Sequence, residues 1–256
     1  MTIIDLNADI GEAETPEGRR AEADILKYIS SANIACGGHA GTTETMQVTV
    51  KGAMANGVVI GAHPGYPDKE NFGRQSMMLG QDIDPESLKE TLTAQIKALC
   101  DIAKTANARV AYVKPHGALY NDAVVSRAHA DLIANVIKDI DPDLYFMGGP
   151  NSEMGRAAKV HGLRFITEGF IDRRYTDDGH LQNRAIDGAV IKDQSLRMQQ
   201  ALSLAVQNTV NTASGKPMTI KAQSLCLHGD SAGAVETAKQ ARTVLEAAGI
   251  TIKAFA

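Results

Sequence analysis

Residues 3–10 read Ile-Ile-Asp-Leu-Asn-Ala-Asp-Ile, and this stretch carries most of the information about the fold. Its apolar start predicts a first β-strand over Ile3–Leu6. Polar and apolar residues then alternate, which puts three polar side chains on one face of an extended chain: Asp5, Asn7 and Asp9. Buried carboxylates are unfavourable unless they are paired, hydrogen-bonded or metal-bound. We interpret this face as the floor of a site, with an internal hydrogen-bond network as the alternative.

Further apolar runs predict strands at regular intervals along the chain. We expect them at Ser31–Cys36, Val58–Ala62, Arg109–Val113, Leu144–Met147, Leu163–Ile166 and Ser224–Leu227, with an edge strand over the tail Ile250–Phe255. Apolar residues at helical spacing predict helices between them, around residues 88–99, 132–140, 198–210 and 235–248. About seven βα units without a Pro- or Ser-rich linker predict one α/β barrel domain over residues 1–256. A doubly wound open sheet is the alternative, because the pattern does not fix strand order.

Composition and charge exclude several classes of protein. The net charge of -4 and the lack of a basic run argue against a nucleic-acid partner. No stretch approaches 18 consecutive apolar residues, and the N-terminus lacks the features of a signal peptide, so we expect a cytoplasmic protein without a membrane partner. The three cysteines form no CxxC pair, which argues against a disulfide framework or a zinc ribbon.

Four of the seven histidines directly follow predicted strands, each with glycine close by: His39, His63, His116 and His228. Ligand sites in parallel α/β folds lie at the carboxyl ends of the strands. We therefore expect these side chains to meet in one cavity. Lys114 shares a strand face with His116 and suits an anion or oxyanion, with a strand-end salt bridge as the alternative.

The loops and remaining histidines carry weaker signals. Arg173 or Arg174, after the sixth strand, has the geometry to bind a carboxylate or phosphate, although solvated loop charges explain the segment equally well. A long loop over residues 64–74 is expected to cover the mouth of the barrel. His129 and His161 fall in predicted helices and are expected at the surface. No Walker phosphate loop, GxGxxG or GxSxG motif occurs.

Six ordered blocks together resemble the LamB/YcsF family. They are Asp5–Glu12, Ala32–His39, Gly61–Asp68, Val113–Asn121, Glu168–Arg174 and Leu225–Asp230. The resemblance implies a distorted seven-stranded (β/α) barrel, like that of the glycoside hydrolase/deacetylase superfamily. It also implies the A subunit of an ATP-dependent 5-oxoprolinase, which acts with B and C subunits. That enzyme cleaves 5-oxo-L-proline to L-glutamate, with ATP as co-substrate.

Opening a lactam requires an activated water, a stabilised oxyanion and a proton for the leaving nitrogen. We expect Asp9 to act as general base and Lys114 with His116 to stabilise the oxyanion. His228 is a further catalytic candidate, and Arg173 is expected to hold the substrate carboxylate. The other candidate substrate contacts are Asn7, His63 and Glu168.

The resemblance to the deacetylase fold implies a divalent metal held by one Asp and two His, for which Asp9, His39 and His63 are the candidates by position. Two other functions stay open. One is a stand-alone metal-dependent amide or acetyl hydrolase, which would work without ATP. The other is a non-catalytic subunit that only binds the substrate.

Overall fold

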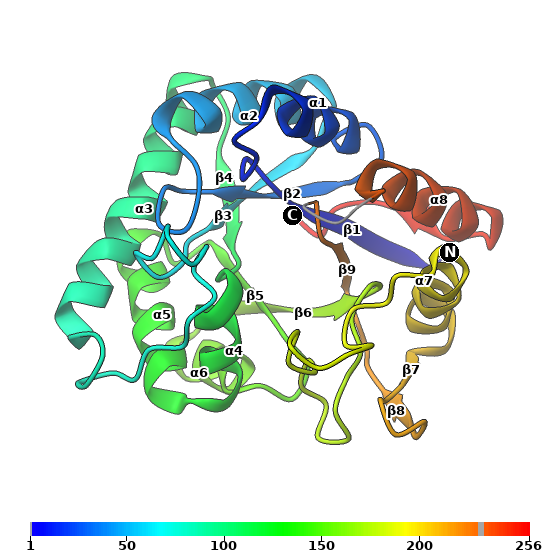
Figure 1. The fold of residues 1–256 in the computed structure, drawn as a ribbon. Coiled ribbons are helices and arrows are strands. Elements are labelled where there is room, and N and C mark those ends of the chain that lie inside the picture. The colour runs from blue at the N-terminus through cyan, green and yellow to red at the C-terminus, as the bar shows by residue number, and fades with distance from the viewer. Residues whose placement is uncertain (1, 230–232) are drawn as a thin grey trace.

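Seven parallel strands close into a barrel in the computed structural model, which describes residues 2–229 and 233–256 (Figure 1). The strands are β1 (Ile3–Ile10), β2 (Ser31–Ala35), β3 (Val59–His63), β4 (Val110–Val113), β5 (Tyr145–Gly148), β6 (Arg164–Phe170) and β9 (Ser224–Leu227). They pair in that order, and β9 pairs with β1 to complete the ring. The expected closed barrel is confirmed, and the open sheet is excluded.

Helices surround the barrel on the outside (Figure 1). They are α1 (Pro16–Ile25), α2 (Thr43–Ala55), α3 (Pro85–Thr105), α4 (Gly117–Val125), α5 (Arg127–Ile140), α6 (Glu153–His161), α7 (Gln194–Leu202) and α8 (Ala234–Ala247). Helix α3 begins at Pro85, because Asp84 accepts a hydrogen bond from the backbone N–H of Ser87 and Pro85 starts the first turn. In the described part of the chain, no helix combines the length and apolarity that crossing a membrane requires.

The layer of side chains around Asp5 and Asn7 in the interior of the barrel is polar. Asp5 is buried and accepts hydrogen bonds from the hydroxyls of Ser30 (2.6 Å), Ser31 (2.7 Å) and Ser224. Asn7 donates to the Ser224 hydroxyl at 2.6 Å. The polar face of β1 therefore forms an internal hydrogen-bond network at this depth, as the alternative interpretation expects.

Glycine and tyrosine fill the next layer. A Cβ on Gly61 would lie 2.1 Å from the ring of Tyr112, so only glycine allows this ring to cross the barrel. The Tyr112 hydroxyl donates to Asn33 at 2.6 Å. Phe255 contacts the Tyr112 ring with its own ring (5.3 Å between centroids), which explains why the C-terminus lies near the barrel axis in Figure 1.

Three expectations about local structure need correction. The helix expected through residue 210 ends earlier, because Asn208 adopts a left-handed conformation (φ 54°) and a short antiparallel pair follows, β7 (Thr209–Asn211) and β8 (Pro217–Thr219). Only β10 (Thr251–Ile252) of the expected edge strand forms, beside β1. His129 is buried rather than exposed, with ring contacts to Ser126 and the Met77 carbonyl. Asp230 lies outside the described residues.

Asp5 makes stability depend on pH. Burial raises its pKa to about 6, so the folded chain favours the neutral carboxyl. Its contribution to stability is complete below about pH 4 and is lost as the pH rises through 6. Relative to Asp5→Asn, the wild type should gain about 2 kcal/mol of unfolding free energy between pH 7.5 and 4.5 in urea titrations. An equal difference at both pH values would contradict this, and Asp101→Asn, an exposed change, is the control.

Candidate active site

A cavity of about 450 Å³ opens where the carboxyl ends of the strands meet. Side chains from β1, β3, β4, β6 and β9 or from the loops after them reach it, although they lie far apart in the sequence. The lining includes Asp9, Glu12, His63, Lys114, His116, Tyr120, Phe170, Arg173 and His228. Of the four strand-end histidines expected to meet here, His63, His116 and His228 line the cavity and His39 does not.

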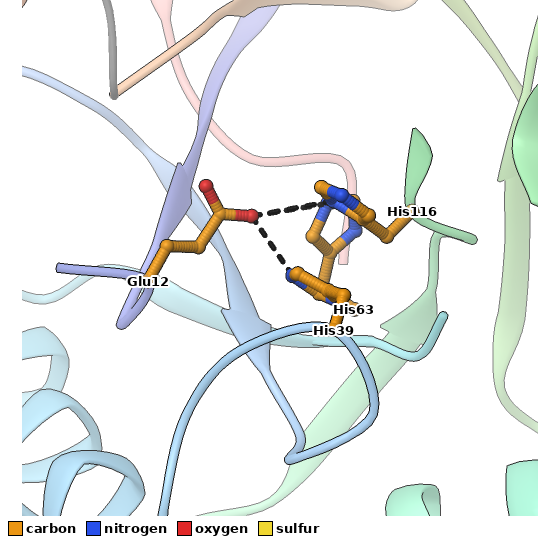
Figure 2. Close-up of side chains that lie close together, drawn as sticks. All are labelled: Glu12, His39, His63 and His116. Atoms are coloured by element: carbon orange, nitrogen blue, oxygen red, sulfur yellow. Dashed lines mark hydrogen bonds and ion pairs between the residues drawn. The ribbon is translucent and has the colours of Figure 1, made fainter. Parts of the chain in front are cut away.

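Four buried side chains, called here the imidazole cluster, point their polar atoms toward one another: Glu12, His39, His63 and His116 (Figure 2). The Glu12 Oε1 atom lies 3.0 Å from His39 Nε2, 3.3 Å from His116 Nδ1 and 3.9 Å from His63 Nε2. Hydrogen bonds with His116 and His39 hold the pKa of Glu12 below its usual range despite burial, so its carboxylate is ionised.

Hydrogen bonds to the backbone fix which ring nitrogens carry lone pairs. His63 Nδ1 donates to the carbonyl of Lys114 (2.7 Å), and His116 Nε2 donates to the carbonyl of Phe72 (2.9 Å), because a carbonyl only accepts. In neutral rings the opposite nitrogens, His63 Nε2 and His116 Nδ1, then face each other with lone pairs at 3.0 Å. Two lone pairs at this separation repel unless a proton or a cation lies between them.

The imidazole cluster fits a divalent cation. Its four ligand atoms all lie within 4.8 Å of one another, and the Glu12 oxygen lies 3.0–3.9 Å from the three imidazole nitrogens. Ligands of a tetrahedral zinc ion are roughly 3.3–3.6 Å apart. Two of its imidazoles already donate their outer N–H to backbone carbonyls, which is the usual arrangement around metal-bound histidine. Burial lowers the pKa of His39 to about 4, so this ring is neutral and free to act as a ligand near pH 7.

The loop after β1 presents Glu12 to the cavity. Gly11 adopts φ +82°, which turns the chain at the end of the strand. The buried carboxylate of Glu22 then accepts hydrogen bonds from the backbone N–H groups of Glu12 and Ala13, both at 2.9 Å. Helix α1 therefore holds the residue that completes the cluster.

Lys114 lies beneath the cavity and is almost fully buried. Its ammonium group is 2.9 Å from both Asp9 Oδ1 and Glu168 Oε1, and it donates to Cys226 Sγ at 3.0 Å. These anionic neighbours raise its pKa well above the usual value, and His63 together with Lys114 holds the pKa of Asp9 well below its usual value. Lys114 therefore helps to keep Asp9 ionised and forms an ion pair with Glu168 as well.

Asp172 and His228 form a second acid and imidazole pair at the cavity. His228 Nδ1 lies 2.8 Å from Asp172 Oδ2, and the backbone N–H of His228 also contacts this carboxylate (3.3 Å). These contacts with His228 hold the pKa of Asp172 at about 2, so its carboxylate is ionised and accepts the Nδ1–H. In the neutral imidazole, Nε2 then carries the lone pair. His228 is thereby oriented as a proton acceptor.

The structure places four of the expected site residues differently from the sequence-based expectations. Asp9 is outside the imidazole cluster and is bound by Lys114 instead, with its Oδ2 atom 3.5 Å from His63 Nε2. Asn7 and Glu168 are fully buried below the residues that line the cavity, because they point inward from lower positions on β1 and β6. His39 lies behind His116, with the two rings stacked at 3.4 Å.

Sequence reasoning missed three functional candidates. Glu12, Tyr120 and Asp172 all fall within the blocks that carry the family resemblance, which is the signal that could have identified them. Their roles depend on partners far along the chain: Asp172, for example, contacts a histidine 56 positions away.

Comparisons with known proteins identify the family of the chain. The family model described as LamB/YcsF family matches residues 4–256. A protein from Shouchella clausii, named as the A subunit of 5-oxoprolinase, is 44% identical over 254 residues, 99% of each chain. Another of the same name from Kocuria rhizophila is 41% identical over the full length of both.

Solved structures extend the comparison to the fold. A lactam utilization protein from Thermus thermophilus superposes with a TM-score of 0.89 at 36% identity, covering 99% of this chain and 100% of that one. The Xyl-CE4 domain of a xylanase from the hindgut metagenome of Trinervitermes trinervoides shares only the fold, with a TM-score of 0.53 at 15% identity over 98% of this chain and 86% of that one. From the family match and the sequence identities, the chain belongs to the LamB/YcsF family.

Proposed function

We propose that this chain is the A subunit of a 5-oxoprolinase and contains the site at which the lactam is opened. The observation that carries the proposal is the meeting of two acid and imidazole groups at one cavity, in a chain similar to proteins named as the A subunit of 5-oxoprolinase. In this proposal the complex cleaves 5-oxo-L-proline to L-glutamate with hydrolysis of ATP. The B and C subunits complete it in the cytoplasm, and they handle ATP wholly or in part.

His228 is the residue that we assign to proton transfer. Its Nε2 atom takes a proton from the attacking water and returns it to the ring nitrogen as the C–N bond breaks, while Asp172 holds the imidazole in place. Asp9 is less suited to be the base, because its lowered pKa makes it a weak proton acceptor. Arg173 binds the substrate carboxylate.

The remaining charges stabilise the reacting carbonyl. Lys114 supplies a fixed positive charge beneath the cavity, and His116 lies at its wall. Glu12, His39, His63 and His116 would hold a divalent metal ion, which when bound supplies Lewis-acid polarisation of the carbonyl. Asp9, beside His63, adds negative charge that favours a cation there.

A second function, a stand-alone metal-dependent amide or acetyl hydrolase, is favoured by the imidazole cluster itself. It predicts hydrolysis by this chain without ATP. A third, a subunit that only binds the substrate, predicts that substitutions at His228 leave turnover of the complex unchanged.

The proposed reaction is tested by glutamate release from 5-oxo-L-proline. We expect release only when this chain, the B and C subunits from the same genome, and ATP are all present. Turnover by the chain alone without ATP would support the stand-alone hydrolase and contradict the proposal. Release by the B and C subunits without this chain would also contradict it.

Asp172→Asn should lower kcat of the complex by about 10²-fold or more with little change in KM, because the variant no longer holds His228 in the productive tautomer. Steady-state kinetics of glutamate release measure both constants. Asp187→Asn, at an exposed residue in the segment between β6 and α7, is the control. Unchanged kcat in Asp172→Asn would remove His228 from the proposed role.

Metal analysis of the purified chain tests the imidazole cluster. We expect about one divalent ion per chain, and Glu12→Gln or His63→Asn should reduce this content at least tenfold, because each removes a ligand. Dialysis against a chelator should lower the melting temperature of the wild type but not of these variants. His161→Asn, on α6 and outside the cluster, is the control. Metal-free wild type after growth with added metal would contradict the assignment.

A further inference from the structure

Two buried hydrogen-bond donors at the cavity lack an acceptor. The Tyr120 hydroxyl and the Arg173 Nε–H have no hydrogen-bond partner within residues 2–229 and 233–256, although their residues are only 4% and 3% exposed. Buried polar groups in proteins are nearly always hydrogen-bonded, so each exception calls for an explanation. Both residues line the same cavity, which points to an acceptor supplied by a ligand.

Packing holds the Tyr120 side chain in position. Its ring meets the Phe170 ring edge to face, with centroids 5.8 Å apart. A Cβ on Gly149 would lie 3.2 Å from the Tyr120 hydroxyl, so glycine leaves this side open. Burial raises the pKa of Tyr120 well above its usual value, and the hydroxyl stays protonated and able to donate.

Arg173 adds an unneutralised positive charge. Its Nη2 atom donates to the carbonyl of Gln182 (2.7 Å), and no carboxylate in the described part of the chain lies within ion-pair distance of its guanidinium. Burial and the nearby Arg184 lower its pKa to about 10, so it is still charged at neutral pH. A buried cation with a free N–H favours an anionic ligand.

Phe170 provides an apolar surface beside these donors. Its ring also stacks against His228 at 5.7 Å, next to the proposed proton acceptor. We propose that Tyr120, Phe170 and Arg173 form a subsite for a small apolar ring that bears a carboxylate. The carboxylate accepts from the Tyr120 O–H and the Arg173 Nε–H, and the ring methylenes pack on Phe170.

Only the identity of the ring, the lactam of 5-oxoproline, rests on the proposed function. In this subsite Tyr120 and Phe170 bind the substrate together with Arg173, and the three side chains fix its orientation. With the carboxylate at this subsite, the amide is directed to the part of the cavity that Glu12, His63 and His116 line.

Calorimetric titration of the full chain with two lactams tests the subsite independently of turnover. The ligands are 5-oxo-L-proline and 2-pyrrolidone, which is the same ring without the carboxylate. Tyr120→Phe and Arg173→Lys should each weaken binding of 5-oxo-L-proline by about tenfold or more, because a hydrogen bond to a charged group is lost. Binding of 2-pyrrolidone should change less than twofold.

Thermal unfolding separates this role from a structural one. Tyr120→Phe should keep or raise the melting temperature, because the hydroxyl has no hydrogen bond to lose within the described chain. The control Tyr145→Phe, at a hydroxyl that accepts from Arg164, should leave binding of both lactams unchanged. Equal weakening of both lactams, unaltered binding in Tyr120→Phe, or no binding of 5-oxo-L-proline by the wild type would each overturn the subsite. Absence of ATP-dependent turnover with this binding pattern intact would overturn only the proposed function.

Discussion

The buried ammonium group of Lys114 is the interaction on which the site depends. It lies between Asp9 and Glu168, with 2.9 Å to each carboxylate, and its side chain is almost fully buried. The ion pairs stabilise the fold here, because an unpaired buried charge is strongly unfavourable. The backbone of the same residue also orients His63, whose Nδ1–H donates to the Lys114 carbonyl.

The end of β4 therefore joins the interior of the barrel to the cavity. Below it, the Lys114 side chain fixes the charges of the inner layer. Above it, the His63 Nε2 and His116 Nδ1 atoms face Glu12, and the cluster has the charge and geometry for a cation (Figure 2). The Asp172 and His228 pair approaches the same cavity from β6 and β9. A substrate in the cavity would contact both groups, as a reaction that needs both charge stabilisation and proton transfer requires.

Much of the fold could be predicted from the sequence because buried strands are short apolar runs between helical segments. All seven barrel strands begin within one residue of the prediction, although β1 and β6 run four residues further. The β7 and β8 pair could not be predicted in this way, since Val210 continues a helical spacing that the left-handed Asn208 interrupts. The left-handed conformation of Asn208 ends the helix before β7, and the spacing of apolar residues does not indicate that conformation.

For the site, the sequence predicted which strand ends matter but not which atoms meet. His39, His63 and His116 are in one cluster, as convergence at the barrel rim requires. The carboxylate that joins them is Glu12 and not Asp9, because Gly11 turns the chain beyond β1 while Asp9 still points into the barrel toward Lys114. The partnership of Asp172 with His228 likewise depends on the pairing of β6 with β9, which brings the ends of these two strands side by side.

A crystal structure of this chain with 5-oxo-L-proline and a divalent cation would show where both ligands bind. We expect the cation among Glu12, His39, His63 and His116, and the lactam in the adjoining cavity with its ring nitrogen near His228 Nε2. A lactam bound elsewhere on the chain, or a cation held away from this cluster, would contradict this expectation.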